Sequence, residues 1–425
     1  MRRQFKTKYT VSYLLTAFIV LIGPLTAFAL SLDEAIKMAK EKLPSYKASI
    51  IKIQASENLY RASLSPYLPS IDLSTSNKKF FTNSEEYDTR SYSLTMGYTL
   101  FDAGKRKTNR QIARLSLEQD RQELERNTLE LEFNVKNAFY RALAQLEILD
   151  QRRIALKNTE KDHEVAEGRY RLGVAKLSDV LQASVRLEQA KFNLIQAEGD
   201  YRKALSDLNS LIGKPLDSEY RLEGSLETDL REINLQRLIE RTLERPEIKK
   251  YRLSEEIARS NLSLTMSEFY PKVSASASYT KTGGGGSRTF SPEEKSAGIT
   301  IAWNIFELGK FYKKKASEAE SRVSGETLND IIRQASLDVT KSYQDFIIAL
   351  SKVRVAEEQL KQAEQNYAQA FGEYKVGKGD ILSLVQAESA LANARQQLID
   401  SKLNLILSKS TIERVAGIHR LEEFR

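Results

Sequence analysis

The 425-residue sequence has no cysteine and only two histidines. Without cysteine the chain can form no disulfide framework, no thiolate nucleophile and no cysteine-based zinc or iron–sulfur site. His163 and His419 are too few and too isolated for a histidine-based metal centre or a Ser-His-Asp arrangement, because each of these needs several groups at one point. We therefore expect no catalytic residue, no metal site and no cofactor.

The composition also excludes wholesale disorder and a polytopic helical membrane protein, since 41% of the residues are hydrophobic and 29% are charged. The length alone suggests two or three compact domains of roughly 150 residues each. That estimate fails for elongated or repetitive chains, so internal repeats decide the organisation.

Half of the formal net charge of +8 lies in a short N-terminal segment. Four basic residues precede the first acidic residue, Asp33, and an apolar run over residues 11–29 closes with the small-x-small triplet Ala27-Phe28-Ala29. This order predicts a secretory signal peptide over residues 1–29; the alternative is an N-terminal membrane anchor. Its removal leaves 61 basic against 57 acidic residues and no dense basic cluster, so we expect no nucleic-acid partner.

Five landmarks recur about 204 residues apart, a period far longer than the 20 to 50 residues of solenoid units. The pairs are PSYK at Pro44 and PEIK at Pro246, YLP at Tyr67 and FYP at Phe269, YTLFDAGK at Tyr98 and WNIFELGK at Trp303, YRLGVAKLSDVLQA at Tyr170 and YKVGKGDILSLVQA at Tyr374, and LIG ending at Gly213 and AGI around Gly417. We expect a first repeat over residues 30–215, a linker over 216–233 and a second repeat over 234–425.

Proline is absent from residues 70–214 and 293–425, and such gaps permit long helices. Residues 103–169 are rich in good helix formers and predict one helix of about 100 Å. Helical hairpins are expected to turn at residues 171–175 and 375–379. A shorter helix over residues 44–64 would stack end to end with the return helix over 176–212, so that together they nearly match the long helix.

The return helices carry a seven-residue spacing, which is typical of coiled-coil packing. The series is Val180, Leu187, Leu194, Tyr201 and Leu208 in the first repeat, and Leu384, Leu391, Leu398, Leu405 and Ile412 in the second.

Two stretches in each repeat alternate strictly between apolar and Ser/Thr-rich positions: residues 71–76, 91–100, 273–279 and 299–305. Alternation over about ten residues suits a membrane strand with lipid outside and water inside; the alternative is a half-buried hairpin of a soluble sheet. The polar connections over residues 77–90 and 281–296 are expected to be solvent-facing loops. Large aromatic residues at the strand ends predict an interfacial girdle: Tyr67, Tyr98, Phe101, Phe269, Tyr270, Trp303 and Phe306.

Four strands cannot close a barrel, and unpaired strand edges are not tolerated in lipid. Two copies of the chain would supply eight strands around a filled interior, whereas three would supply twelve with room for a lumen. A transport role favours three copies.

The signal peptide, PSYK helix, YLPSIDLS strand, YTLFDAGK stretch, RYRLGVAKLSDVLQA tip and SLIGKP end, followed by their repeat, resemble the TolC-type outer-membrane efflux proteins, the outer membrane factors. The resemblance implies a mainly α-helical chain with a membrane β-barrel portion. It implies a homotrimer whose twelve-stranded barrel lies in outer-membrane lipid and continues as an α-helical barrel of coiled-coil hairpins into the periplasm, with the linker in the equatorial region. The duct would serve a tripartite efflux pump or a type I secretion system through a periplasmic membrane-fusion adaptor and an inner-membrane transporter.

By the same resemblance the hairpin tips contact the adaptor. The first tip comprises Tyr170, Gly173, Val174, Ala175, Leu177, Ser178 and Asp179; the second comprises Tyr374, Gly377, Lys378, Gly379, Asp380 and Ser383. The alternative is a plain turn with Gly173 and Gly377 as left-handed caps, which is compatible with docking. Some relatives carry Asp on the inward side of the closing helices, but the matching positions here are Ser383 and Gln386. A ring of carboxylates is therefore not expected in the pore.

The function favoured by these patterns is a passive, water-filled conduit. The alternative is a structural coiled-coil spacer between envelope layers, which accounts for the heptads but not for four alternating strands. An enzyme is the weakest reading, because Glu118, Asp120 and Glu125 lie on a charged helix face that suits ordinary ion pairs. The absence of cysteine also excludes the lipid-anchored N-terminus of some relatives. The sequence does not identify the exported substrate, the pump or the adaptor.

Overall fold

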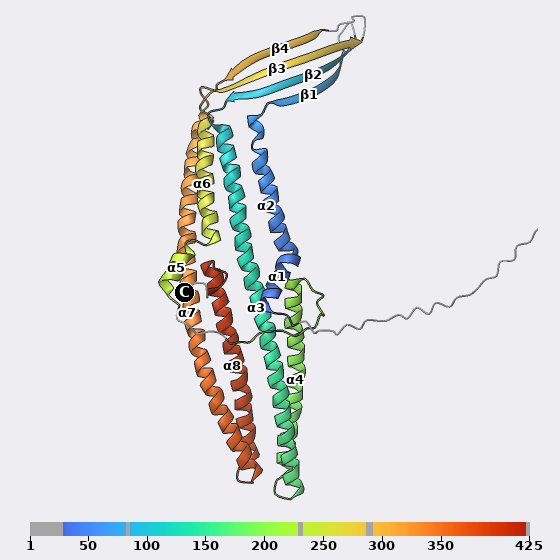
Figure 1. Cartoon of the computed structure of the whole chain (residues 1–425), viewed down its shortest axis with the longest axis vertical. Coiled ribbons are helices and arrows are strands. Elements are labelled where there is room, and N and C mark those ends of the chain that lie inside the picture. The colour runs from blue at the N-terminus through green and yellow to red at the C-terminus, as the bar shows by residue number, and fades with distance from the viewer. Residues whose placement is uncertain (1–28, 82–85, 228–232, 286–291, 422–425) are drawn as a thin grey trace, which may run out of the picture.

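A computed structural model describes residues 29–81, 86–227, 233–285 and 292–421. The molecule is elongated, with a four-stranded sheet at one end and two helical hairpins whose tips lie at the other (Figure 1). The predicted signal peptide lies, apart from its last residue, outside the described residues.

Six helices build the elongated body. The long helices are α3 (Lys105–Arg171) and α7 (Leu308–Lys375), with 67 and 68 residues, and each returns through a shorter helix, α4 (Leu177–Ile212) or α8 (Ile381–Ala416). Beside the upper halves of the long helices lie α2 (Pro44–Ala62) and α6 (Pro246–Ser267) (Figure 1). The predicted long helix and hairpin are confirmed to within two residues. Within the described segments no helix has the length and apolarity to cross a bilayer.

Two glycines allow the short helices to stack end to end, as predicted. Gly213 ends α4 with φ +65° and Gly417 ends α8 with φ +71°. A Cβ on Gly213 would lie 2.7 Å from the Cβ of Lys42, and one on Gly417 would lie 2.7 Å from the Cβ of Arg245. Only glycine combines a left-handed conformation with so close an approach. The chain entering α2 or α6 can therefore cross directly over the end of α4 or α8.

Two short helices beside the body were not predicted: α1 (Leu32–Lys42) and α5 (Leu235–Thr242). Their start signals are nevertheless present in the sequence. Ser31 and Glu34 form a capping box at the start of α1, and Asn234 accepts hydrogen bonds from two backbone amides at the start of α5. Ala39 of α1 packs into a core with α3 and α4, and Leu238 of α5 packs with α7 and α8.

The packing places α3 between two stacked pairs. One side of α3 contacts α2 and α4, the other contacts α6 and α8, and α7 contacts the far side of α6 and α8. The two heptad series differ in burial. Four of the five α8 residues are buried, namely Leu384, Leu391, Leu405 and Ile412, whereas in α4 only Leu208 is. Within one chain α8 is therefore enclosed by α3 and α7, while much of α4 stays uncovered.

The sheet consists of β1 (Ser70–Phe81), β2 (Glu86–Phe101), β3 (Lys272–Gly285) and β4 (Glu293–Ala302), antiparallel in the order β1-β2-β3-β4. The four predicted strands are present, but the first three are longer than the predicted ten residues. The expected loops over 77–90 and 281–296 are wrong over most of their length, because the strands continue to pair through them. Backbone pairing, rather than burial of side chains, holds these polar stretches extended.

The fourth strand ends earlier than predicted. Residues 299–305 were expected to be a strand, yet β4 ends at Ala302, opposite Lys272. The residue before Lys272 is Pro271, which has no N–H to donate to a ladder. Trp303 instead donates its indole N–H to the carbonyl of Phe269 at 3.1 Å, as the chain turns towards α7.

Candidate functional site

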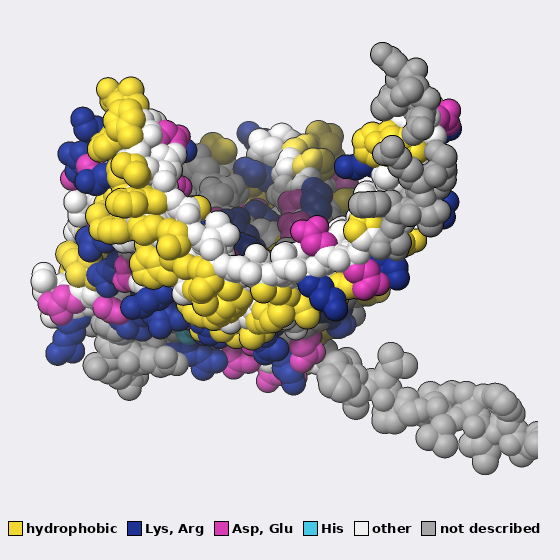
Figure 2. Space-filling view, turned by 90° about the horizontal axis from the view of Figure 1, so that it is seen from above, with side chains coloured by type: hydrophobic (Ala, Val, Ile, Leu, Met, Phe, Trp, Pro, Cys, Tyr) yellow, Lys and Arg dark blue, Asp and Glu magenta, His cyan; other side chains and the backbone are white. Residues whose placement is uncertain are grey.

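The two faces of the sheet have opposite chemistry. On one face apolar rows cross the strands, with Ile71 opposite Met96 and Leu73 opposite Leu94. On the other face hydroxyl groups hydrogen-bond across strands, and Ser93 Oγ lies 3.0 Å from Thr280 Oγ1. In β2 the polar face is the partly covered one and the apolar face is exposed. Figure 2 shows the hydrophobic side chains along the outer side of the curved sheet and the uncharged polar ones along its inner side.

The seven predicted girdle residues lie at the end of the sheet nearest the helices, but among them only Tyr98 and Phe101 belong to a strand. Tyr67 lies in a short 3-10 turn, and the other four lie just before β3 or just after β4. Two further residues, Arg106 and Phe311, pack against these aromatic rings. The Arg106 guanidinium lies over the rings of Tyr67 and Tyr98, at 5.3 and 5.9 Å from their centroids. The Phe311 ring packs edge-on against Phe269 at 5.4 Å. Both lie in the first turns of long helices, where no periodic signal distinguishes them from other helical residues.

At the first tip most side chains are exposed to solvent. Gly173 has φ +75°, as predicted for a left-handed cap. Leu172 is 80% exposed, and Val174 and Leu177 are also exposed, so an apolar knob projects at the end of the hairpin. Tyr170, Ser178 and Asp179 lie around it, with the Ser178 hydroxyl donating to Asp179 at 3.3 Å. Ala175 is half-buried.

The second tip has the same backbone turn, with φ +82° at Gly377, but a different surface. Tyr374 is 1% exposed, so in this conformation its ring is not available to a partner. Asp380 caps α8 by accepting from the backbone N–H of Ser383 at 2.7 Å and from its hydroxyl at 3.2 Å. These hydrogen bonds lower the pKa of Asp380. Lys378 and Gly379 lie in the turn, and Ser383 and Gln386 are exposed.

One arginine joins the two tips. Arg169 on α3 donates from Nη1 to the backbone carbonyl of Tyr374, and its guanidinium lies 4.6 Å from the centroid of the Tyr374 ring. A second nitrogen donates to the carbonyl of Val174 at 3.4 Å. Burial raises the pKa of Tyr374, as does the charge of Asp179, while Arg169 opposes the shift. Sequence reasoning missed Arg169, because its partner lies 205 residues away.

Above the tips the two hairpins meet around two acids, the buried Asp162 and the half-buried Glu388. The Tyr367 hydroxyl donates to Asp162 Oδ1 at 3.3 Å, and among the described residues Asp162 Oδ2 has no hydrogen-bond partner. Burial raises the pKa of Asp162 to about 6, although the Tyr367 hydrogen bond and the charge of Lys161 oppose the shift. Burial and the charge of Asp162 raise the pKa of Glu388 to about 7, against the effect of Arg186.

The charged face of α3 serves in ion pairs, as the sequence suggested. Glu118 pairs with Arg121 at 3.3 Å and Asp120 with Lys52 at 2.7 Å. His419 lies between two carboxylates, with Nδ1 at 2.8 Å from Glu132 and Nε2 at 3.0 Å from Glu125. The Glu132 hydrogen bond, more than the Glu125 one, raises the pKa of His419. These contacts fasten residues 418–421 to α3.

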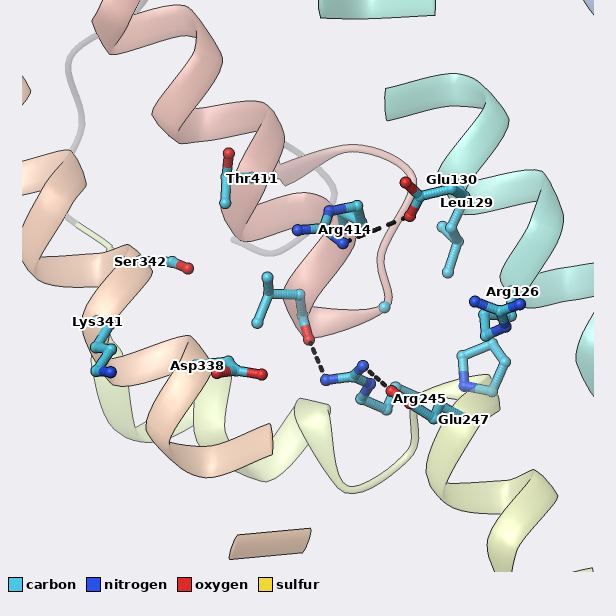
Figure 3. A pocket seen from close by; sticks show the side chains of 13 residues that line it. Arg126, Leu129, Glu130, Arg245, Glu247, Asp338, Lys341, Ser342, Thr411 and Arg414 are labelled. Carbon is cyan, nitrogen blue, oxygen red and sulfur yellow. Dashed lines mark hydrogen bonds and ion pairs between the residues drawn. The ribbon is translucent and has the colours of Figure 1, made fainter. Parts of the chain in front are cut away.

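A cavity lies where α8 ends and α6 begins (Figure 3). Three guanidinium groups approach it, from α3, from the residue before α6 and from α8. Each has a carboxylate partner: Glu123 for Arg126, Glu247 for Arg245 and Glu130 for Arg414. We interpret it as a charge-balanced joint between helices and assign it no ligand. Across the described segments no group of three or more His, Asp or Glu side chains is placed to hold a metal ion.

Comparison with known proteins gives a consistent result. A protein-family model described as "Outer membrane efflux protein" matches residues 35–214 and again 238–417. The alkaline protease secretion protein AprF of Pseudomonas aeruginosa is 23% identical over 435 residues, which cover 96% of this chain and 88% of AprF. The toluene efflux pump outer membrane protein TtgC of Pseudomonas putida is 22% identical over 91% of this chain and 83% of its own.

Among solved structures, the outer membrane protein VceC from Vibrio cholerae superposes with a TM-score of 0.78, covering 91% of this chain and 96% of VceC. Its sequence identity is 19%, so the likeness shows the fold alone.

Proposed function

This chain belongs to the outer membrane efflux protein family, and from that premise we propose that three copies assemble into the exit duct of a tripartite efflux pump or a type I secretion system. The family assignment made from the sequence is thereby confirmed. The protein is an outer-membrane channel component, and family members are channel proteins rather than enzymes. The trimer, the adaptor and the transporter are our proposals.

The observation that carries the proposal is the chemistry of the sheet. Its outer face is apolar and its inner face carries hydroxyl groups, while both edge strands, β1 and β4, have an unpaired side in the single chain. Three copies would pair β4 of each with β1 of the next and close twelve strands around a polar lumen. A spacer without a lumen gives no reason for a polar face on the concave side of such a sheet.

The helices support a conduit that is narrowed at the tips. In our proposal the open first tip offers its apolar knob, Leu172, Val174 and Leu177, to a periplasmic adaptor. The second tip is held by Arg169 against the first hairpin. A partner can open the duct only if it binds the separated tips more strongly than the joined ones.

Ion conductance tests the duct. The full-length protein, reconstituted in planar bilayers, should carry a small ion current that increases when Arg169 is replaced by alanine. Absence of current in both proteins would contradict the channel and favour the spacer.

Assembly is tested separately on a denaturing gel. An unheated sample of a membrane-barrel trimer should migrate differently from a heated one, because the closed barrel resists detergent until heated. Identical migration would contradict the trimeric barrel.

A further inference from the structure

The alternation that fits a membrane strand changes at the far end of the β-hairpin formed by β1 and β2. Up to the Thr75 and Tyr92 pair, apolar side chains face outwards and hydroxyl groups face inwards. Beyond it the outward positions are polar or charged except for Phe81, and Lys79 forms an ion pair with Glu86. The inward positions end in two aromatic residues, Phe80 and Tyr87, directly opposite each other.

The inward direction follows from the pleat. Ser76 pairs with Ser91 on the hydroxyl face, and Phe80 and Tyr87 lie four residues beyond them, so they share that face. Phe81, the next residue, therefore lies on the outer face. It is 73% exposed, with the Lys79 ammonium 5.2 Å from its ring centroid.

The two rings form a stacked platform. Their centroids are 5.1 Å apart, their planes differ by 16°, and each residue remains 39% exposed. On the neighbouring strand β3 the register places Gly284 beside Thr89, which is the inward-facing residue of β2 next to Tyr87. Each ring thus keeps accessible apolar surface on a face that is otherwise polar.

In a twelve-stranded barrel these rings do not reach their copies. With a strand spacing of about 4.8 Å and a tilt of about 40°, opposite backbones lie roughly 24 Å apart. The platforms of three protomers would therefore line the exit separately and stay in contact with water. Stacking of a planar group on this apolar surface is favourable, because it removes the surface from water.

We propose that Phe80 and Tyr87 form an aromatic binding site at the extracellular mouth of the duct, which takes the planar aromatic part of an exported molecule. The inference rests on the proposed trimeric duct. It assigns to the exit a substrate preference that the hydroxyl-lined barrel below it lacks. The rival interpretation is a purely structural cross-strand pair that ties the hairpin end.

Current block separates these interpretations. The full-length trimer in a planar bilayer is exposed from the extracellular side to N-acetyl-tryptophanamide, or to N-acetyl-leucinamide as the aliphatic control. The aromatic amide should block the current at lower concentration than the aliphatic one. Phe80→Leu with Tyr87→Leu keeps apolar bulk but removes both rings, so the half-blocking concentration of the aromatic amide should rise by roughly three- to tenfold.

The matched control is Phe81→Leu, the same change one residue along on the outer face, which should leave the block unchanged. Equal block by the two amides, an unaltered block in the double variant, or an equal loss in Phe81→Leu would each overturn the site. The unheated gel band verifies assembly of each variant. If the double variant does not assemble, Tyr87→Phe takes its place; this variant keeps both rings and should retain the block. A wild-type protein without any current would instead overturn the proposed duct itself.

Discussion

Tyr170 in the first hairpin tip and Tyr374 in the second occupy the same place, three residues before a glycine with positive φ, yet their surroundings are opposite. Tyr170 is 44% exposed, whereas Tyr374 is buried beneath a guanidinium. The residue before each tyrosine explains the difference. Arg169 precedes Tyr170 and reaches across to the second hairpin, while the acidic Glu373 precedes Tyr374 and is exposed.

The helix starts after the two turns differ in the same way. Asp380 caps α8 with two hydrogen bonds to Ser383, whereas within the described structure the side chain of Lys176 gives α4 no capping hydrogen bond. A duplicated module thus keeps its backbone through glycine and helix positions, and single side chains then differentiate the copies. In our proposal the first tip faces the adaptor and the second closes the duct.

The largest expected effect comes from blocking the first tip. Gly173→Trp should abolish efflux while trimers still form, because a Cβ at Gly173 points into open space and a large ring there would cover the apolar knob. Drug or toxin export from cells that depend on this protein measures the loss, and the unheated gel measures assembly.

Gly173→Ala is the control for that experiment. Alanine imposes the same left-handed strain, about 1–2 kcal/mol, with little bulk, so most efflux should remain. Normal efflux in the tryptophan variant would show that the first tip does not dock.

A smaller effect is expected from releasing the second tip. Arg169→Ala removes the hydrogen bond to Tyr374 and the cation–π contact, so the resting conductance should rise severalfold. Single-channel recording measures it. Arg171→Ala is the matched control, because Arg171 lies in the same turn with an exposed side chain that pairs with Glu167 at 3.3 Å. An equal rise of the resting conductance in both variants would show that Arg169 does not hold the tip closed.

The contact between the hairpins should depend on pH. Because burial raises the pKa of Asp162 from its ordinary 3.8 to about 6, its ionisation opposes folding, and stability should fall as pH rises from about 4 to 6. Asp162→Asn should weaken this dependence, leaving the part that the raised pKa of Glu388 contributes, and should stabilise the protein by about 1 kcal/mol at pH 7.5. Thermal unfolding at pH 4.5 and 7.5 tests it.

Asp150→Asn, on an exposed part of α3, provides the comparison and should leave the pH dependence in place. If both variants unfold alike at both pH values, Asp162 is not the group responsible.

The smallest expected effect is at the helix starts. Asp380→Ala should destabilise the first turn of α8, because two hydrogen bonds to the Asp380 carboxylate are lost. Lys176→Ala should change the start of α4 little. Amide hydrogen exchange in residues 381–385 and 177–181 compares the two turns. Equal acceleration in both would contradict the difference between the caps.

Local and periodic features were predictable from the sequence. Proline-free stretches indicated the long helices, glycines indicated the turns, and strict alternation indicated the strands where one face is apolar. The capping signals of α1 and α5 were also present, but such short helices lack the periodicity that would have drawn attention to them.

The alternation did not predict the polar end of the β1–β2 hairpin, beyond Asn77. The chain there stays extended through backbone pairing rather than through burial of one face. The inward placement of Phe80 and Tyr87 therefore emerged only from the register.

The sequence by itself determined a doubled helical hairpin with four amphipathic strands, since these depend on residues a few positions apart. Only the tertiary structure decided that Arg169 holds Tyr374 and that Asp162 is buried beside Tyr367. Each of these contacts joins residues 205 positions apart. Repetition gives both hairpins the same local signals, so the choice between an exposed and a buried tyrosine arises only when the two are packed together.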